Sequence, residues 1–321
     1  MRILVTGGAG FIGSHLCERL ISDGYTVTAI DNFSTGRASN LTDLKDSNNF
    51  TLVEGSILDS NILTPLINDA DYIFHLAAAV GVFNIVNNPL ASLLTNIRGT
   101  ENVLEAAHAT KTPVFLTSSS EVYGKNISDS LKESDDRILG SPITLRWSYS
   151  EAKAIDESLA FAYFVEKQLE TRIIRFFNTV GPRQLGSYGM VVPRFVKAAL
   201  ANEPITIYGD GNQTRCFAHV YDVIDAVIAI AFAGNTIGKV INIGNNFEIS
   251  INSLAKKIID ETGSKSAMVY VPYEEAYGAG FEDMERRVPN IDLINQLVGW
   301  KPKRDLSTMI ADISREMKKG S

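Results

Sequence analysis

A glycine-rich turn near the start of the chain constrains the fold most strongly. A short β-branched run, "RILV" (2–5), leads directly into "TGGAGFIG" (6–13), and a helical pattern follows it. The three glycines in G-x-x-G-x-x-G spacing are Gly7, Gly10 and Gly13. This spacing permits a tight turn, close approach of the backbone to a pyrophosphate and close packing of the helix on the strand. The turn also points the positive end of the helix at the phosphates.

An acidic residue at the end of the second predicted strand supports the same interpretation. Asp31 follows the glycine turn by roughly 20 residues, which is the spacing of a ribose-binding carboxylate in dinucleotide folds. A carboxylate there accepts hydrogen bonds from both ribose hydroxyls and repels a 2′-phosphate. The sequence therefore predicts an NAD site, with NAD preferred over NADP.

The rest of the first half alternates short apolar runs with helical patterns. These runs lack a clean alternation of polar and apolar residues, which favours strands buried on both faces and hence a parallel sheet with helices on each side. The predicted strands are 2–5, 26–30, 50–54, 72–76, 113–118 and 171–176, and the predicted helices are about 12–23, 60–70, 89–110 and 148–168. The fold class is therefore α/β, with a Rossmann-type doubly wound parallel sheet.

The pattern of apolar and polar residues changes after residue 177. A loop rich in glycine and polar residues (178–189) is followed by alternating helical and strand patterns, at about 190–201, 205–209, 221–232, 240–244 and 251–262. We expect an NAD-binding Rossmann domain over 1–177. Residues 178–321 are expected to form mainly a smaller α/β lobe that binds substrate, with some elements returning to the first domain.

Composition and charge exclude several classes of partner. A net charge of −7 argues against nucleic acid or an anionic membrane as the main partner. Cys17 and Cys216 form no disulfide framework, and no apolar run approaches the roughly 18 residues that span a membrane. The first strand starts too early to leave room for a signal peptide. We therefore expect a cytoplasmic protein, and the four histidines have no partners at ligand spacing that predict a metal site.

Two segments in the middle of the chain carry groups suited to acid–base chemistry. Tyr149 and Lys153 lie four residues apart on a predicted helix, so their side chains project from the same face. A phenol has an ordinary pKa of about 10, and a neighbouring ammonium together with a positive nicotinamide favours its ionised form. Ser119, at the end of a predicted strand, is placed to hydrogen-bond the same substrate hydroxyl. These residues predict a base, its activating partner and a hydroxyl helper.

With these motifs the sequence resembles the extended short-chain dehydrogenases/reductases that modify nucleotide sugars, over essentially its whole length. The matching segments are "TGGAGFIG", "DNFSTG" (31–36), "HLAA" (75–78), "TNIRGT" (95–100), "SSSEVYG" (118–124), "YSEAK" (149–153), "RFFNTVGPR" (175–183) and "GDGNQTRCFAHVYD" (209–222). The resemblance implies an NAD site formed by Gly7, Gly10, Phe11, Ile12, Asp31, Asn32, Ser34, Gly36, Leu76, Ala77, Asn96, Ser118, Tyr149 and Lys153.

The resemblance also implies a UDP-sugar substrate. Arg215 and Arg287 match positions that hold the diphosphate, which suits the forked geometry of guanidinium groups. Asn178 matches a further contact to the diphosphate, and Val192, Arg194 and Tyr208 lie in segments that enclose the uracil. Arg287 is favoured over its neighbour Arg286, because only one of two adjacent side chains faces inward.

Glu121 bears on which reaction the family resemblance implies. In this family Tyr149 takes the proton of the carbon-4 hydroxyl while hydride passes from carbon 4 to NAD+. A 4-epimerase then returns the hydride to the other face, whereas a sugar with a carboxylate at carbon 6 loses carbon dioxide. Dehydratases of dTDP-glucose carry an Asp-Glu pair in the serine segment, and Ser120 at the matching position argues against that branch.

The remaining signals point in different directions. Glu121 and Arg146, in "RWSYSEAK", resemble UDP-glucuronate decarboxylases, and galactose-type 4-epimerases usually have a small or hydroxyl residue at position 121. Segments 178–195 and 280–290 look most like nucleotide-sugar epimerases, and Ser119 replaces a threonine typical of both branches. A purely structural alternative is that Glu121 pairs with a nearby base such as Arg146.

On balance the sequence slightly favours an NAD-dependent UDP-sugar 4-epimerase, acting on a UDP-hexose or a UDP-hexuronate such as UDP-glucuronate. UDP-glucuronate decarboxylase is the alternative, and a non-catalytic NAD-binding module is a remote one that intact Ser119, Tyr149 and Lys153 argue against. Helices 89–110 and 148–168 resemble those that pair across a two-fold axis in this family, so a homodimer is expected.

Overall fold

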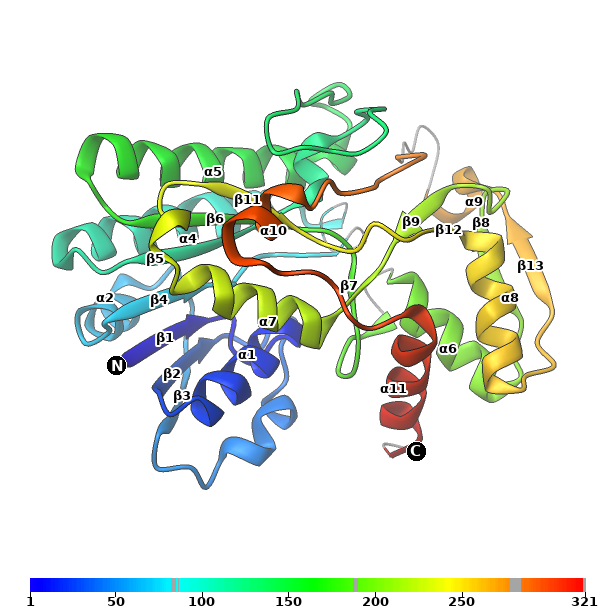
Figure 1. Ribbon diagram of the computed structural model, residues 1–321, viewed down its shortest axis with the longest axis horizontal. Coiled ribbons are helices and arrows are strands. Elements are labelled where there is room, and N and C mark those ends of the chain that lie inside the picture. The colour runs from blue at the N-terminus through cyan, green and yellow to red at the C-terminus, as the bar shows by residue number, and fades with distance from the viewer. Residues whose placement is uncertain (82–84, 86, 187–189, 278–283, 320–321) are drawn as a thin grey trace.

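A seven-stranded parallel sheet forms the centre of the computed structural model, which describes residues 1–321 except 82–84, 86, 187–189, 278–283 and 320–321 (Figure 1). Its strand order is β11-β6-β5-β4-β1-β2-β3, and each neighbouring pair is parallel. The strands are β1 (Arg2–Thr6), β2 (Thr26–Asp31), β3 (Phe50–Glu54), β4 (Tyr72–His75), β5 (Val114–Ser119), β6 (Thr171–Phe176) and β11 (Val240–Ile243). The predicted Rossmann-type fold is confirmed.

Helices cover both faces of this sheet, which makes it doubly wound (Figure 1). One face carries α1 (Phe11–Ser22) and α7 (Val220–Ala231), and a core that includes Leu16, Leu20 and Val227 lies beneath them. The other face carries α2 (Ser60–Asn68), α4 (Pro89–Thr110) and α5 (Ser148–Lys167), with a core of their own. The 3-10 helix η1 (Ala38–Leu44) adds Leu41 and Leu44 to the first core.

The burial of the strands follows their place in the sheet. Every residue of β4 is buried, and so are all but the last of β5 and β6, as the unalternating apolar runs predicted. The same expectation is wrong for β3, in which no residue is fully buried and Leu52 is exposed. Of the residues of this edge strand, Phe50 alone packs against a hydrophobic core, so the other side chains are left largely uncovered.

A second, smaller hydrophobic core lies beyond the carboxyl end of the sheet (Figure 1). It is formed by α6 (Val191–Ala201), β8 (Ile205–Tyr208), α8 (Ile251–Thr262) and α11 (Leu306–Lys319). The shorter elements around it are β7 (Thr179–Val180), β9 (Thr214–Cys216), β10 (Ala218–His219), β12 (Glu248–Ser250), β13 (Met268–Val271) and α9 (Tyr273–Tyr277). Two others, η5 (Gly234–Thr236) and α10 (Asp292–Val298), lie beside the large sheet, and Ile294 of α10 joins the first core. The proposed division at residue 177 stays a prediction, although β11 belongs to the large sheet.

The topology sets where a ligand can bind. Strand order reverses between β1 and β4, and ligands of such sheets bind in the crevice beyond the carboxyl ends of the strands at this point. The elements of the smaller core stand over the same end of the sheet (Figure 1). Parts of the segments 178–195 and 280–290, which resembled epimerases, lie outside the described residues. Among the helices that the structure describes, none has the length and apolar character needed to cross a membrane.

Candidate active site

A cavity of about 490 Å³ opens between the carboxyl ends of the strands and the smaller core. Nearly all the site residues predicted from the sequence line it. These are Gly7, Gly10, Phe11, Ile12, Asp31, Asn32, Ser34, Leu76, Ala77, Ser118, Ser119, Glu121, Tyr149, Lys153, Asn178, Val192, Arg194, Tyr208, Arg215 and Arg287. Gly36 and Asn96 are the two predicted residues that do not line it, and both lie behind its wall.

Backbone geometry shapes the end of the cavity below the glycine turn. Gly7 has a φ of 71°, and a Cβ there would lie 2.8 Å from the backbone nitrogen of Ala77. A Cβ on Gly13 would lie 2.2 Å from the carbonyl oxygen of Gly7. Helix α1 begins directly after Gly10, and no side chain caps its first amides. The turn is thus kept open as a cradle of backbone N–H groups, which suits the pyrophosphate of a dinucleotide.

Asp31 is fixed at the end of β2 by this turn. Its carboxylate accepts hydrogen bonds from the backbone nitrogens of Ala9, at 2.9 Å, and Phe33, at 2.8 Å. Burial raises the pKa of Asp31, and these backbone donors oppose the rise. Gly36 leaves room for the carboxylate, because a Cβ there would lie 2.8 Å from Oδ2. The donor set and the open cradle fit NAD.

Asn96 supports the cavity from α4. Its side-chain oxygen accepts a hydrogen bond from the nitrogen of Ala79 at 2.7 Å, and its amide group donates to the oxygen of the same residue at 3.3 Å. Ala77, two residues before Ala79, lines the cavity. Asn96 therefore holds the segment after β4 in place.

The residues predicted for acid–base chemistry converge from β5 and α5. Ser119, the last residue of β5, forms a hydrogen bond with Tyr149 that favours the ionised phenol. Burial and the negative charges of Glu121 and Asp156 act the other way and raise the pKa of Tyr149 well above its usual range. Lys153, one turn along α5, is almost fully buried. A positive nicotinamide ring would therefore add the charge that favours the phenolate.

Glu121 lies between two guanidinium groups. Arg146 Nη1 donates to its Oε2 at 2.6 Å, and Arg287 Nη1 forms an ion pair with its Oε1. Burial opposes ionisation of Glu121, but the two arginines outweigh it and lower its pKa to about 2. We call Glu121, Arg146 and Arg287 the Glu121 cluster. The ion pair considered as the structural alternative is present, and a second arginine joins it inside the cavity.

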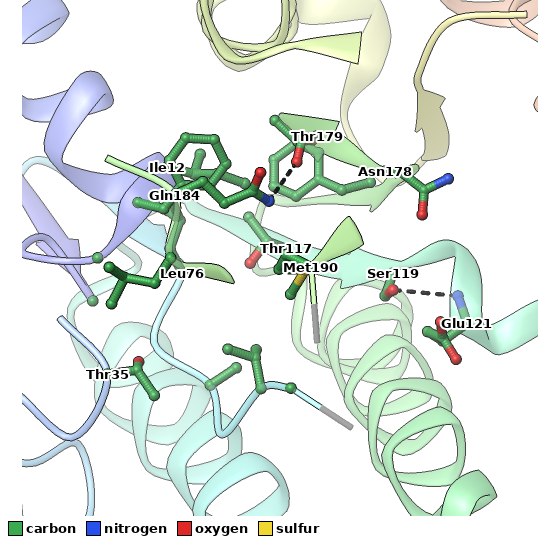
Figure 2. A pocket seen from close by; sticks show the side chains of 18 of the residues that line it. Ile12, Thr35, Leu76, Thr117, Ser119, Glu121, Asn178, Thr179, Gln184 and Met190 are labelled. Carbon is green, nitrogen blue, oxygen red and sulfur yellow. Dashed lines mark hydrogen bonds between the residues drawn. The ribbon is translucent and has the colours of Figure 1, made fainter. Parts of the chain in front are cut away.

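Local structure explains how Glu121 reaches this place. The chain turns sharply after β5 into a 3-10 helix, η2 (Ser120–Tyr123), and the Ser119 hydroxyl caps it by accepting a hydrogen bond from the nitrogen of Glu121 at 3.2 Å. Figure 2 shows this bond, with Asn178 lying near the same end of the cavity. A second short helix, η3 (Leu145–Trp147), brings Arg146 to Glu121 just before α5.

The remaining predicted substrate residues line the cavity next to the Glu121 cluster and beyond it. Asn178 accepts a hydrogen bond from Arg287 Nη2 and donates to the oxygen of Cys216 at 2.9 Å. The Arg194 guanidinium lies 4.3 Å from the centre of the Tyr208 ring. Arg215 is mostly buried and donates to the oxygen of Thr214 at 2.8 Å. Arg286, by contrast, pairs with Glu248 and stays out of the cavity lining.

Several lining residues were missed at the level of sequence. Gln184 donates to the oxygen of Thr179 at 2.9 Å and borders the cavity near Met190 (Figure 2). Gln213 donates to the Tyr273 hydroxyl at 2.9 Å, and both line the cavity. Gln184 lies in the loop that follows a strand, and this position is the only feature of the sequence that could have indicated it. Tyr273 lies far along the chain and had no motif around it.

Comparisons with known proteins identify the family of this chain. The family model described as GDP-mannose 4,6 dehydratase matches residues 4–313. The chain belongs to this family. Its structural neighbours are NAD-dependent epimerases and dehydratases, as the resemblance to extended short-chain dehydrogenases/reductases implied. NAD is therefore its cofactor.

Individual relatives in this family differ in reaction. A UDP-N-acetyl-alpha-D-glucosaminuronate decarboxylase of Bacillus cytotoxicus is 41% identical over 94% of this chain and 92% of its own length. A UDP-glucuronic acid decarboxylase of Xenopus tropicalis is 36% identical over 94% of this chain and 68% of its own. The solved UDP-glucuronic acid 4-epimerase of Bacillus cereus, in complex with UDP-glucuronic acid and NAD, superposes with a TM-score of 0.90 at 30% identity, and each chain is covered fully.

Within this family the chain is thus an enzyme acting on a nucleotide sugar. The cavity brings together a hydrogen-bonded phenol, a lysine, a cradle for NAD and a cluster of arginines. Such an arrangement can oxidise an alcohol beside a charged group on the same sugar. Which step follows the oxidation depends on the Glu121 cluster.

Proposed function

We propose that this chain is an NAD-dependent decarboxylase of a UDP-hexuronate, which acts through a 4-keto intermediate. The observation that carries the proposal is the Glu121 cluster, because it places two buried guanidinium groups in the cavity that also holds Tyr149. The curated relatives named decarboxylases support it. The sequence alone slightly favoured a 4-epimerase, whereas the names of these relatives support the decarboxylase that was its alternative.

The charge of the Glu121 cluster suits a substrate that carries a carboxylate. One carboxylate and two guanidinium groups leave a net charge of one positive unit. Arg287 Nε is buried and has no hydrogen-bond partner among the residues that the structure describes. A second carboxylate, at carbon 6 of the sugar, would balance this charge and could accept a hydrogen bond from that nitrogen. A UDP-hexose would bring only its diphosphate to offset this charge, whereas a UDP-hexuronate also supplies a carboxylate on the sugar itself.

The chain's own residues then account for the acid–base part of the reaction. Tyr149 takes the proton of the carbon-4 hydroxyl, and Ser119 holds the same oxygen. NAD, which the glycine turn and Asp31 would hold, would supply the hydride acceptor for carbon 4 and the hydride donor that later restores it. The oxidised sugar is a β-keto acid, so its carbon 5–carbon 6 bond breaks, carbon dioxide leaves, and the electron pair moves to the carbon-4 oxygen. Carbon 5 then takes up a proton.

The state of Glu121 limits its role. With a pKa lowered to about 2 it is ionised near neutral pH, so it cannot donate a proton while both arginines are in place. Its suitable role is to hold Arg146 and Arg287 in position and to accept hydrogen bonds from sugar hydroxyls. It also separates the two positive charges, which lie on segments far apart in the sequence.

A 4-epimerase is the second candidate. It is supported by the likeness of the whole chain to the UDP-glucuronic acid 4-epimerase of Bacillus cereus. The two reactions share the oxidation at carbon 4 and differ in what happens to the carboxylate. An epimerase has to keep the carboxyl group out of the geometry in which its bond to carbon 5 breaks.

Product analysis separates the two candidates. The purified protein is incubated with NAD+ and either UDP-glucuronate or UDP-N-acetylglucosaminuronate, and the products are read by mass spectrometry and NMR. Loss of carbon dioxide from either sugar is expected. A product of unchanged mass with inverted carbon 4 would replace the proposal with the epimerase. The Tyr149→Phe variant serves as the control, since it should form neither product.

We further propose that the chain forms a homodimer through α4 and α5. Both helices lie on one face of the sheet and expose large apolar side chains, namely Leu90, Ile155, Phe161 and Val165. Apolar groups gathered on one face of a soluble protein are a common mark of an interface. Light scattering at micromolar concentration that gives the mass of one chain would count against the dimer.

A further inference from the structure

The ammonium group of Lys153 has an acidic partner that the family motif does not require. Lys153 Nζ donates to Asp156 Oδ2 at 3.0 Å and to the backbone oxygen of Thr117 at 3.1 Å. Both side chains are almost fully enclosed, since 3% of Lys153 and 0% of Asp156 is exposed. Two of the three ammonium hydrogens are thus used inside the protein. The third is left for the cofactor ribose or for Tyr149.

Asp156 is a fully buried carboxylate. It lies three residues after Lys153 on α5, in the sequence "KAID", and none of it is exposed to solvent. A fully buried carboxylate is costly unless its charge is paired. Burial raises the pKa of Asp156, while Lys153 and the Thr100 hydroxyl lower it. Its Oδ1 makes no other hydrogen bond within the described part of the chain.

A chain of buried polar groups approaches Asp156 from the other side. The nitrogen of Ala77 donates to Thr6 Oγ1 at 3.1 Å, and this hydroxyl lies 2.8 Å from His75 Nδ1. His75 Nε2 lies 3.1 Å from Thr100 Oγ1. Burial, and then the charge of Lys153, lower the pKa of His75 to about 3, so the ring is neutral. Thr100 thus links the His75 ring to Asp156, because its hydroxyl also favours the ionised form of that carboxylate.

The other charges around Tyr149 are already paired. Glu121, from η2, is held by Arg146 from η3 and by Arg287. Glu157, beside Asp156 on α5, forms an ion pair with Arg175 of β6 at 2.7 Å. His75 of β4 is neutral. Among these groups, Asp156 is the one whose charge acts directly on Lys153, the ammonium that favours a phenolate at Tyr149.

We propose that Asp156 is a positioning residue that holds Lys153 in place and balances its charge, so that Tyr149 both takes and returns a proton. The proposal rests on the proposed use of Tyr149 as the base at carbon 4, but it does not depend on whether carbon dioxide is then lost. Epimerase and decarboxylase alike begin with deprotonation of a hydroxyl and end with protonation of a ketone oxygen.

The physical reason lies in the two directions of this proton transfer. An unbalanced ammonium beside the phenol would make Tyr149 a stronger acid, and its phenolate would be a correspondingly weaker base. A group of this kind returns the last proton well but removes the first one badly. Asp156 offsets part of the field of Lys153, and its negative charge is one of the causes that raise the pKa of Tyr149. The group is thereby suited to both steps.

Ultraviolet difference titration of the phenolate in the NAD+-loaded protein tests the proposal without any substrate. Asp156→Asn keeps the size of the side chain and removes its charge, so the ionisation midpoint of Tyr149 should fall by about one pH unit. The titration curve of a counterpart that also carries Tyr149→Phe is subtracted from that of the wild type and from that of the variant. The difference is the signal of Tyr149 alone. Because no sugar is present, an error in the proposed reaction cannot produce or hide this shift.

Two further variants sharpen the test. Asp156→Glu retains the charge and should keep the midpoint near that of the wild type, whereas Glu151→Gln, on the exposed side of α5, should leave it unchanged. A midpoint in Asp156→Asn equal to that of wild type, with normal fold and NAD content, would overturn the proposal and leave Asp156 a merely structural residue. If Asp156→Asn is not recovered folded, Asp156→Ser, which also removes the charge, decides in its place. A downward shift of the Tyr149 midpoint supports the proposal, and no shift overturns it.

Discussion

The two halves of the cavity are built by different means. The half expected to hold NAD, the NAD half, is made mostly of backbone: the turn at Gly7 to Gly13, the first amides of α1 and a carboxylate fixed by two backbone nitrogens. The half proposed to hold the sugar, the sugar half, is made of charged side chains from separate segments, with Glu121, Arg146 and Arg287 at its centre. A backbone cradle recognises what NAD-dependent enzymes share, whereas side-chain charges can differ between relatives with one fold.

Tyr149 belongs to both halves, and its loss should have the largest effect. Tyr149→Phe removes the hydroxyl that accepts the substrate proton, so turnover should fall by a factor of about 10²–10⁴. Binding of NAD should change little, because the cradle of the glycine turn is untouched. Steady-state rates and the NAD content of the purified variant measure the two effects. A variant that turns over normally would mean that another group is the base.

The sugar half alone should be sensitive to Arg287. Arg287→Met removes one of the two guanidinium groups paired with Glu121, and kcat/KM should fall by about 100-fold. Arg286→Met is the matched control, because Arg286 pairs with Glu248 outside the cavity and should change kcat/KM less than threefold. Equal losses in the two variants would contradict the assignment of Arg287 to the site.

The same contrast explains what could be read from the sequence. The glycine turn and Asp31 lie close together in the chain, and the spacing of Tyr149 and Lys153 places both on one helix face. Local patterns therefore indicated the NAD half and the proton-transfer residues. Arg146 and Arg287 both contact one carboxylate because loops distant in the sequence pack together. No periodic pattern within a single segment predicts such a contact. Glu121 was noticed, but one of its two partners was assigned to the diphosphate.

Elements that exist only through tertiary pairing were also missed. The pairs β7–β10 and β9–β12 have strands of two or three residues, too short to show a period. The helix α11 has a strongly amphipathic sequence and buries Leu306, Met309 and Ile313 in the second core, yet no expectation was made for it. The sequence shows that Asp156 is a neighbour of Lys153 on the helix, because it follows three residues later. The sequence does not show that the Asp156 side chain is buried.

The Glu121 cluster should also make stability depend on pH at the acid end. The pKa of Glu121 is about 2 in the folded chain against an ordinary 4.5, so it contributes stability above pH 4.5 that is lost as pH falls toward 2. The contribution should be about 3 kcal/mol, measured as the unfolding free energy by urea titration at several pH values. Glu121→Gln removes this dependence if the cluster causes it. If the unfolding free energy of that variant still falls as steeply with decreasing pH, other carboxylates cause the loss of stability.

The smallest expected effect tests whether the NAD half depends on backbone alone. Gly13→Ala places a Cβ 2.2 Å from the Gly7 carbonyl oxygen, a backbone atom, so the turn has to shift. Alanine is otherwise a better helix former than glycine by about 1 kcal/mol, so the clash decides the sign. NAD affinity should fall about tenfold, as measured by calorimetry, while the Glu121 cluster and its acid slope stay intact. Gly234→Ala is the control, because a Cβ there meets nothing within 4 Å. If Gly13→Ala binds NAD as tightly as the wild type, the turn can shift without loss of affinity. NAD binding would then not depend on the backbone geometry of the turn in the way described above.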